Sequence, residues 1–274
     1  MTQLRNSSRD SDIGDGDLMR VDYTEVTEVA GSKVSSEQLA RMCQRYYFAS
    51  QFCEGKDVLE VACGSGQGLG YLAKRARKVI GGDCTENLVK IARKYYQDRI
   101  EIKQLDAHKL PFGDNCFDVV ILYEAIYYLA QPEKFVGEAC RVLRKDGVLL
   151  ICTVNKDWSD FNPSPFSTKY FSVPELFQLL SLKFSKVELY GAFPVSSGTV
   201  RDKIVSVIKR LAIAFHLMPK TMKGKEALKR LFLGKLLTLP SEVEDGMAEY
   251  CPPVPISCDS PNFQYKVLFA VARL

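Results

Sequence analysis

Short apolar segments alternate with amphipathic segments through the first two thirds of the chain. Apolar segments of strand length occupy residues 57–61, 78–82, 100–104, 119–123 and 148–154. Between them, as in residues 67–77 and 85–96, apolar side chains recur every three or four residues, which is the spacing of one helix face. Strands that alternate with helices in this way predict a parallel sheet that is covered by helices on both faces.

Several helix ends are marked by residues that cap helices. Two capping boxes are expected, in which paired side chains satisfy free backbone N–H groups: Ser35 with Gln38, and Ser172 with Glu175. Pro132 is a favoured first helical residue, and Gly147 is placed to end the helix that Pro132 begins. Thr85 is the expected cap of the helix that follows the second strand.

The last third of the chain departs from this alternation. Two further strands are expected at residues 186–190 and 265–272, and the roughly 70 residues between them exceed any hairpin loop. A helix is predicted there at residues 199–215. The fold class is therefore α/β: a doubly wound, mostly parallel, seven-stranded sheet (Rossmann-like) with a helical insertion between the last two strands. The expected organisation is a disordered N-terminal tail (1–20), a core with an N-terminal helix (21–194), a basic helical insertion or cap (195–263) and a final strand (264–274).

Composition narrows the class of protein. A formal net charge of +4 is too small to indicate DNA binding. Nine cysteines without a C-x-x-C spacing, and only two histidines, give no pattern for a metal site. The N-terminus has no apolar signal segment, and no uncharged apolar run approaches the roughly 20 residues that span a bilayer. We expect a cytoplasmic protein.

A glycine-rich segment follows the first strand: VLEVACGSGQGLGYLA, residues 58–73. Bare backbone at the end of a parallel strand lets a ligand approach closely, and the next helix directs its partial positive charge there. The dinucleotide pattern G-x-G-x-x-G fails in both registers, because its sixth position is Leu69 or Tyr71. A tight turn without a ligand is the alternative, although such a turn needs fewer glycines.

A different pattern fits this segment. Residues 60–66, EVACGSG, resemble motif I of the class I S-adenosylmethionine-dependent methyltransferases. The segment VIGGDCTENLVKIARK resembles the second-strand motif, with Asp83 at the strand end, and LDAHKLPFGDNCFDVVILYEAIYYL resembles the third and fourth motifs, with Asp106. The segment EACRVLRKDGVLLI resembles the helix, turn and fifth strand that follow. These elements keep the order and spacing of the family over residues 58–154.

The resemblance implies S-adenosyl-L-methionine as the cofactor. It places Glu60 on the cofactor's ammonium, Asp83 on the ribose hydroxyls and Asp106 on the adenine amino group. The full set of cofactor-binding residues that it implies is Glu60, Ala62, Cys63, Gly64, Gly66, Asp83, Cys84, Asp106, Ala107 and Tyr123. Each acid also has a simpler interpretation: Asp83 as a helix cap, Asp106 as a turn residue, and Glu60 as the partner of a buried lysine.

The acceptor of such a methyl group is expected beside the end of the fourth strand. Glu124 is the best-placed carboxylate there to act as a base or to orient an amine, unless it only contacts the cofactor or a backbone amide. Tyr127 and Tyr128, with Trp158 and Tyr170 in the loop after the fifth strand, are candidates for a substrate wall. Plain packing is the alternative for all four aromatic residues.

The predicted insertion is strongly basic. Residues 201–235 hold ten Lys or Arg and two acidic residues. This charge suits an anionic small-molecule acceptor, a membrane surface or RNA, and an ordinary solvated helix face is the alternative. The sequence predicts a methyltransferase acting on a small or medium-sized acceptor, first a sugar or other metabolite of a surface polysaccharide or natural-product pathway, then a hydrophobic metabolite. A non-catalytic binding module and an RNA methyltransferase are the alternatives, and the sequence leaves the oligomeric state open.

Overall fold

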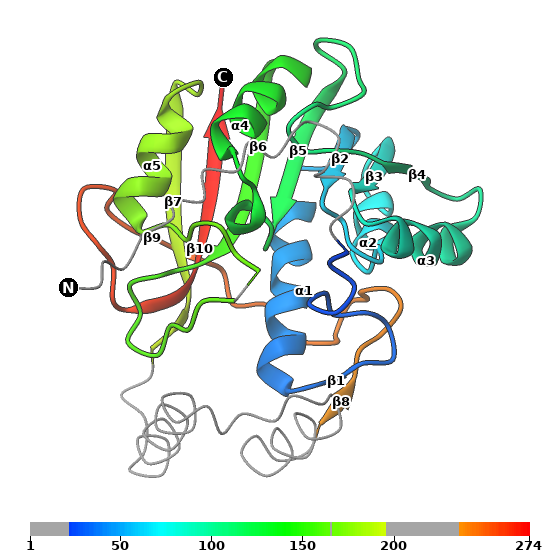
Figure 1. The fold of residues 1–274 in the computed structure, drawn as a ribbon, viewed down its shortest axis with the longest axis horizontal. Coiled ribbons are helices and arrows are strands. Elements are labelled where there is room, and N and C mark those ends of the chain that lie inside the picture. The colour runs from blue at the N-terminus through cyan, green and yellow to red at the C-terminus, as the bar shows by residue number, and fades with distance from the viewer. Residues whose placement is uncertain (1–21, 165, 196–235) are drawn as a thin grey trace, which may run out of the picture.

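A twisted sheet runs through the centre of the computed structural model, which describes residues 22–164, 166–195 and 236–274. Within these ranges the sheet has eight strands in the order β4-β3-β2-β5-β6-β10-β7-β9 (Figure 1). Their bounds are β2 Asp57–Val61, β3 Lys78–Asp83, β4 Glu101–Gln104, β5 Phe117–Tyr123, β6 Leu143–Val154, β7 Lys186–Pro194, β9 Val254–Pro255 and β10 Tyr265–Arg273. The pairs among β4, β3, β2, β5 and β6 are parallel, and β10 runs antiparallel to both of its neighbours. The prediction of a doubly wound, mostly parallel sheet is confirmed, with β9 as an added edge.

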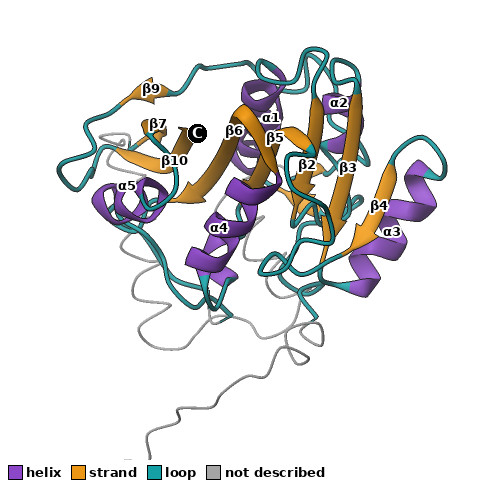
Figure 2. Ribbon diagram, turned by 90° about the horizontal axis from the view of Figure 1, so that it is seen from above, coloured by secondary structure: helices purple, strands orange, loops and turns teal. Residues whose placement is uncertain are grey.

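Helices cover both faces of this sheet (Figure 2). Their bounds are α1 Ser36–Ser50, α2 Leu69–Ala73, α3 Glu86–Tyr96, α4 Pro132–Val142 and α5 Val173–Ser181, with a short 3₁₀ turn, η2, at Ile126–Tyr128. One buried apolar cluster joins α1, α2 and α3 to the sheet, and a second cluster joins α4 and α5 to it. Both faces of the central strands are therefore buried, which explains why these strands are apolar at nearly every position.

The predicted helix starts agree closely with the structure. Ser35 and Ser172 each cap a helix through a complete capping box, and α4 begins at Pro132. Two predicted helices differ from the structure at their ends. The helix expected at residues 67–77 is limited to Leu69–Ala73. Gly147 lies inside β6 and does not end α4, because the buried Leu143 already pairs with Phe117 and turns the chain into the strand.

Of the predicted insertion at residues 195–263, the structure describes residue 195 and residues 236–263. The expected helix at 199–215 and the basic stretch at 201–235 lie outside the described residues, as does the expected tail at 1–20. Residues 236–263 contain no helix; they form β8 (Leu237–Thr238), which pairs with β1 (Lys33–Val34), and the edge strand β9. Leu239 and Val243 are buried in the cluster around α1 and α2. No helix within the described ranges is long and apolar enough to cross a membrane.

The glycine residues at positions 64, 66 and 68 are needed for different structural reasons. Gly64 and Gly66 have φ angles of +59° and +87°, a left-handed conformation that only glycine adopts easily. Gly68 has an ordinary helical backbone, but a Cβ there would lie 1.7 Å from the Tyr46 ring. The missing side chain of Gly68 therefore makes the space in which Tyr46 lies.

Replacing Gly68 by alanine tests this packing. Because Tyr46 has no room to retreat in a buried cluster, we expect Gly68→Ala to lower the free energy of unfolding by about 1–3 kcal/mol, as measured by chemical denaturation. Gly137→Ala in α4 is the matched control, since no atom lies within 4 Å of its added Cβ. The control should be neutral or raise stability by up to about 1 kcal/mol. Equal effects of the two substitutions would contradict the packing argument.

Candidate active site

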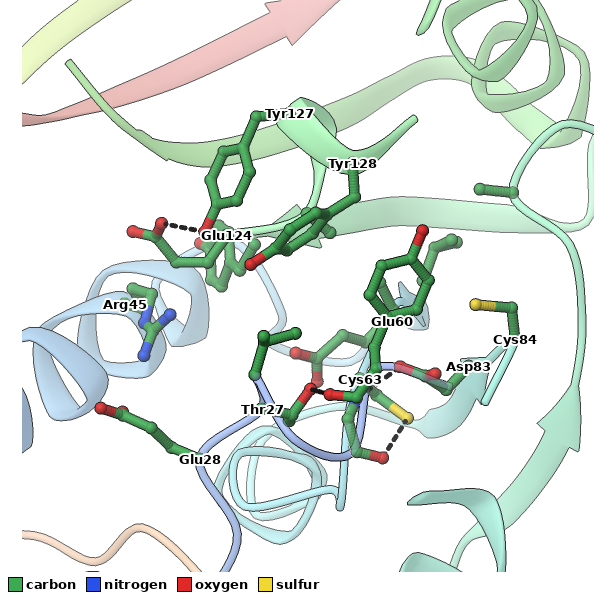
Figure 3. A pocket seen from close by; sticks show the side chains of 18 of the residues that line it. Thr27, Glu28, Arg45, Glu60, Cys63, Asp83, Cys84, Glu124, Tyr127 and Tyr128 are labelled. Carbon is green, nitrogen blue, oxygen red and sulfur yellow. Dashed lines mark hydrogen bonds between the residues drawn. The ribbon is translucent and has the colours of Figure 1, made fainter. Parts of the chain in front are cut away.

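A cavity of about 380 Å³ opens at the carboxyl ends of β2 and β5 (Figure 3). This is the point where the strand order reverses, since β3 and β4 continue to one side of β2 and β5 and β6 to the other. Open α/β sheets bind their ligands at such a reversal, and the volume lies in the range of small-molecule sites. Three carboxylates reach the cavity from the first strands of the chain: Glu60 from β2, Asp83 from β3 and Asp106 from the turn after β4.

The backbone is bent sharply where β2 and β5 end. Ala62 and Glu124, which follow those strands directly, have φ angles of +57° and +51°. Such left-handed conformations cost a residue with a side chain about 1–3 kcal/mol and gather at functional sites. Hydrogen bonds hold both bends, from Cys63 N–H to the Gly82 carbonyl at 2.9 Å and from Glu124 N–H to the Cys152 carbonyl at 2.8 Å. Both strand ends are thereby fixed toward the cavity.

Asp83 links the glycine segment to the start of α3. Its Oδ2 accepts from the Gly64 N–H at 2.9 Å, and its Oδ1 accepts from the Thr85 N–H at 2.8 Å. Thr85 is the N-cap residue, as predicted, but its side chain makes no capping bond. Burial raises the pKa of Asp83 in spite of these backbone donors. Each carboxylate oxygen has a further lone pair, so Asp83 holds the loop and can still accept from a ligand.

Glu60 is buried to 1% exposure beside Asp83. Its partner is Tyr46 of α1, whose hydroxyl donates to Oε1 at 2.8 Å; the lysine partner that the sequence allowed is not found. Its Oε2 has no hydrogen-bond partner among the described residues. Burial raises the pKa of Glu60 to about 8, although the Tyr46 hydrogen bond and Arg45 act against that rise. Glu60 thus lines the cavity and has one buried oxygen without a partner among the described residues.

Asp106, Ala107 and Cys84 also line the cavity. Asp106 accepts from the His108 N–H at 2.8 Å, and its Oδ1 lies 2.7 Å from the His108 ring nitrogen Nδ1. The hydrogen bond to the His108 side chain lowers the pKa of Asp106, although burial opposes this shift. Asp106 is thus both a turn residue and a cavity residue.

Gly66 is the one predicted cofactor residue outside the lining; its carbonyl accepts from the Tyr96 hydroxyl.

Glu124, Tyr127 and Tyr128 form the wall that lies across the cavity from Glu60 and Asp83 (Figure 3). The Tyr127 hydroxyl donates to Glu124 Oε2 at 3.1 Å, and Tyr128 lies beside Tyr127. Tyr123 lines the same wall, and its buried hydroxyl has no partner within the described ranges. Tyr170 stacks on the back of Tyr127, with ring centroids 4.5 Å apart, and does not reach the cavity.

Trp158 also lies outside the cavity lining and packs under the Lys266 ammonium, 5.7 Å from its ring centroid. Of the four predicted substrate residues, the structure brings Tyr127 and Tyr128 to the cavity. Among the described residues, no group of three or more His, Cys, Asp or Glu side chains is arranged to hold a metal ion.

Sequence reasoning missed two parts of the wall. The N-terminal segment at residues 22–31 lies along the glycine segment: Thr27 Cγ2 is 3.1 Å from the position of a Cβ on Gly64, and the Tyr23 ring lies 5.1 Å from that of Tyr128. No periodicity marks this segment, so nothing in the sequence indicated it. Arg41 and Arg45 of α1 also line the cavity. Their spacing, next to the apolar face of a predicted helix, was the one available signal.

Comparisons with known proteins agree with this geometry. Residues 59–151 match a family model described as "Methyltransferase domain". A probable S-adenosylmethionine-dependent methyltransferase of Mycolicibacterium smegmatis is 38% identical over 142 residues, which is 50% of this chain and 54% of the relative. A demethylmenaquinone methyltransferase of Clavibacter sepedonicus is 32% identical over 36% of this chain and 41% of its own length. The match spans about half the length of the first relative.

The solved structures match over more of the chain. A SAM-dependent methyltransferase from Thermotoga maritima superposes with a TM-score of 0.55 at 16% identity, covering 86% of this chain and 91% of that one. This likeness shows a shared fold. The family match, the relatives and the fold agree with the resemblance seen in the motifs at residues 58–154.

The pKa of Glu60 makes stability depend on pH. In the unfolded chain this group titrates near 4.5 and in the folded chain near 8, so the folded state binds more protons between these values. The contribution of Glu60 is therefore fully present below pH 4.5 and is lost as the pH rises through 8. We expect Glu60→Gln to leave stability nearly unchanged at pH 4.5 and to raise the free energy of unfolding by a few kcal/mol at pH 9.

Denaturant unfolding of variant and wild type at the two pH values measures this difference. The exposed Glu133 at the start of α4 supplies the control, because Glu133→Gln should give the same small difference at both values. A gap between Glu60→Gln and wild type that does not grow with pH would show that folding does not raise the pKa of Glu60.

Proposed function

We propose that this chain, which carries a class I methyltransferase domain, is an S-adenosylmethionine-dependent methyltransferase acting on a small or medium-sized acceptor. The observation that carries the proposal is the set of three carboxylates around one cavity, Glu60, Asp83 and Asp106, at the ends of successive strands. The cofactor has an ammonium, a ribose diol and an adenine amino group, and each of these groups donates hydrogen bonds to a carboxylate.

The residues present fit such a ligand. Glu60 Oε2 is a buried acceptor without a partner in the described part of the chain, and such an atom costs about 1–3 kcal/mol unless a ligand satisfies it. The left-handed Gly64 keeps its backbone bare where the ribose approaches. In this proposal Glu60 accepts from the ammonium, Asp83 from the ribose hydroxyls, and Asp106 from adenine. Ala62, Cys63, Cys84, Ala107 and Tyr123 form the surrounding walls.

The bound cofactor supplies an electrophilic methyl group on a sulfonium sulfur, so the protein mainly has to align an acceptor and exclude water. Glu124 is the group that we assign to the acceptor. Its carboxylate is positioned by the bent backbone after β5 and by the Tyr127 hydroxyl. A carboxylate held there can take the proton of an acceptor hydroxyl or orient an amine. Tyr127 and Tyr128 place aromatic rings beside it.

The aromatic wall favours an acceptor with a flat or apolar part. Tyr23, Tyr127 and Tyr128 pack as neighbouring rings at the cavity, and Tyr170 supports them from behind. We therefore favour a hydrophobic metabolite over the surface sugar that the sequence suggested first. The naming of the Clavibacter relative for demethylmenaquinone supports this choice.

Calorimetric titration of the wild-type protein with S-adenosylhomocysteine tests the cofactor assignment. We expect saturable binding of this ligand and none of NADH, because the glycine segment lacks the dinucleotide pattern. Heat with NADH alone would reverse the assignment. The absence of heat with either ligand would favour a binding module that keeps only the fold.

The role of Asp83 predicts a specific loss. We expect Asp83→Ala to weaken S-adenosylhomocysteine binding by about 2–3 kcal/mol, since hydrogen bonds to a charged group are lost. Asp98→Ala, an exposed aspartate after α3, is the control and should bind normally. Circular dichroism checks that the variant is folded, because Asp83 also bonds the Gly64 and Thr85 amides. Unchanged affinity in a folded variant would mean that the ribose is held elsewhere.

A further inference from the structure

His108 lies in the turn after β4, and both of its ring nitrogens are engaged. Nδ1 is 2.7 Å from Asp106 Oδ1, and Nε2 is 3.3 Å from the backbone nitrogen of Gln131. Asp106 pairs with Lys109 across this turn, so Asp106 and His108 belong to one tight loop at the cavity. The side chain of His108 is 7% exposed and that of Asp106 is 18% exposed. The imidazole ring therefore bridges the turn and the residue that precedes α4.

The Gln131 contact decides where the ring proton of His108 lies. A backbone N–H group can only donate, so Nε2 accepts and carries no hydrogen. The neutral imidazole then has its proton on Nδ1, and this N–H group donates to Asp106 Oδ1. Because each nitrogen already has a partner, the ring has no free position from which to take a proton from an acceptor. The arrangement fits a residue that acts through Asp106.

Two donors of His108 converge on one oxygen of Asp106. The backbone nitrogen of His108 is 2.8 Å from Oδ1, and the ring adds a second hydrogen bond to the same atom. Oδ2 takes part in no hydrogen bond within the described part of the chain. The bond from the His108 side chain is also the largest cause of the lowered pKa of Asp106, so this carboxylate is ionised at neutral pH. One charged oxygen thus keeps its lone pairs for a ligand.

The ring bond restricts the orientation of this free oxygen. A single hydrogen bond to Oδ1 leaves a carboxylate able to pivot about that atom, whereas a second donor from another direction limits the rotation. Building on the proposed function, in which Asp106 accepts from adenine, we infer that His108 is a positioning residue. Its Nδ1–H group holds Asp106 so that Oδ2 accepts from the 6-amino group of the cofactor's purine. The site then selects a 6-aminopurine over a 6-oxopurine, because a carbonyl at that position offers the carboxylate no hydrogen.

Stabilising the start of α4 is the competing role for His108. Gln131 is the N-cap residue of α4, and its own side chain makes no capping bond, so the bond from Gln131 N–H to the ring would serve stability alone. The distances favour the role through Asp106, since the ring lies 2.7 Å from Asp106 and 3.3 Å from Gln131. Hydrogen bonds to an ionised group are also the stronger kind.

Calorimetric titration with two ligands separates these roles. S-adenosylhomocysteine carries the 6-amino group, and S-inosylhomocysteine has a carbonyl in its place. Wild-type protein should bind the first about 10–150-fold more tightly than the second, which is the range for a hydrogen bond to a charged group. His108→Ala should reduce this preference by about 3–10-fold, the range for the loss of one ordinary hydrogen bond, and mainly by weakening S-adenosylhomocysteine.

Two conservative variants separate the functions of the ring nitrogens. His108→Asn places an amide nitrogen near the position of Nδ1 and should retain the preference of the wild type. His108→Gln places its amide near the position of Nε2 and should lose the preference as alanine does. Lys109→Ala is the matched control, because its exposed side chain lies in the same turn but outside the cavity lining. If His108→Ala does not fold, the asparagine and glutamine variants carry the comparison.

A double-mutant cycle shows whether His108 acts through Asp106. In an Asp106→Ala background the free oxygen is gone, so adding His108→Ala should leave the ratio of the two affinities unchanged. A purely structural role would not produce this pattern, because a general loss of stability weakens both ligands alike and does not change their ratio. Denaturant unfolding of each variant measures that loss separately.

Three results would overturn the inference. The first is an unchanged ligand preference in a folded His108→Ala variant. The second is a preference that His108→Gln retains and His108→Asn loses, which would assign the ring to the start of α4. The third is equal affinity of the wild type for the two ligands, which would mean that Asp106 does not accept from the purine. If wild-type protein bound neither ligand, the proposed function itself would fail, and this outcome is distinct from all three.

Discussion

The cavity depends on one buried carboxylate that bonds two backbone amides. Asp83 accepts from Gly64 and Thr85, and these residues belong to the glycine segment after β2 and to the N-terminus of α3. Because the segment has no side chain at Gly64 and a left-handed backbone there, it cannot fix itself by packing. The acid at the end of β3 therefore ties this loop to the start of α3, beside the backbone bond from Cys63 to Gly82.

A second chain of contacts supports this arrangement from the α1 side. The space left by Gly68 admits the Tyr46 ring, and the Tyr46 hydroxyl then holds Glu60. Tyr46 and Arg45 are neighbours on α1, so the helix that fixes one oxygen of Glu60 also brings the Arg45 side chain to the cavity. Fold and site are coupled here, because a shift of α1 would alter the packing of Tyr46 and the position of Arg45 together.

The sequence predicted the sheet, the helix starts and most of the carboxyl-end residues because these features have local signals. The sequence directly shows the alternating apolar segments, the capping boxes and the spacing of Glu60, Gly64 and Asp83. The residues that pack behind the cavity and around α1 had no such local signal. That Tyr170 lies behind Tyr127, and that residues 22–31 and 236–250 pack around α1, follows from contacts between segments far apart in the chain. Arg45 was missed for the same reason, since its place at the cavity follows from how α1 packs in three dimensions.

The protonation of Glu60 is linked to the binding of the proposed ligand. With a pKa near 8, Glu60 is largely protonated at neutral pH in the structure described here, and its Oε2 side carries no full charge. An ammonium brought next to it would favour the carboxylate, so cofactor binding below pH 8 should release a proton from this residue. The same burial that lowers the stability of the ionised protein then strengthens the contact, because the pair forms where water does not compete.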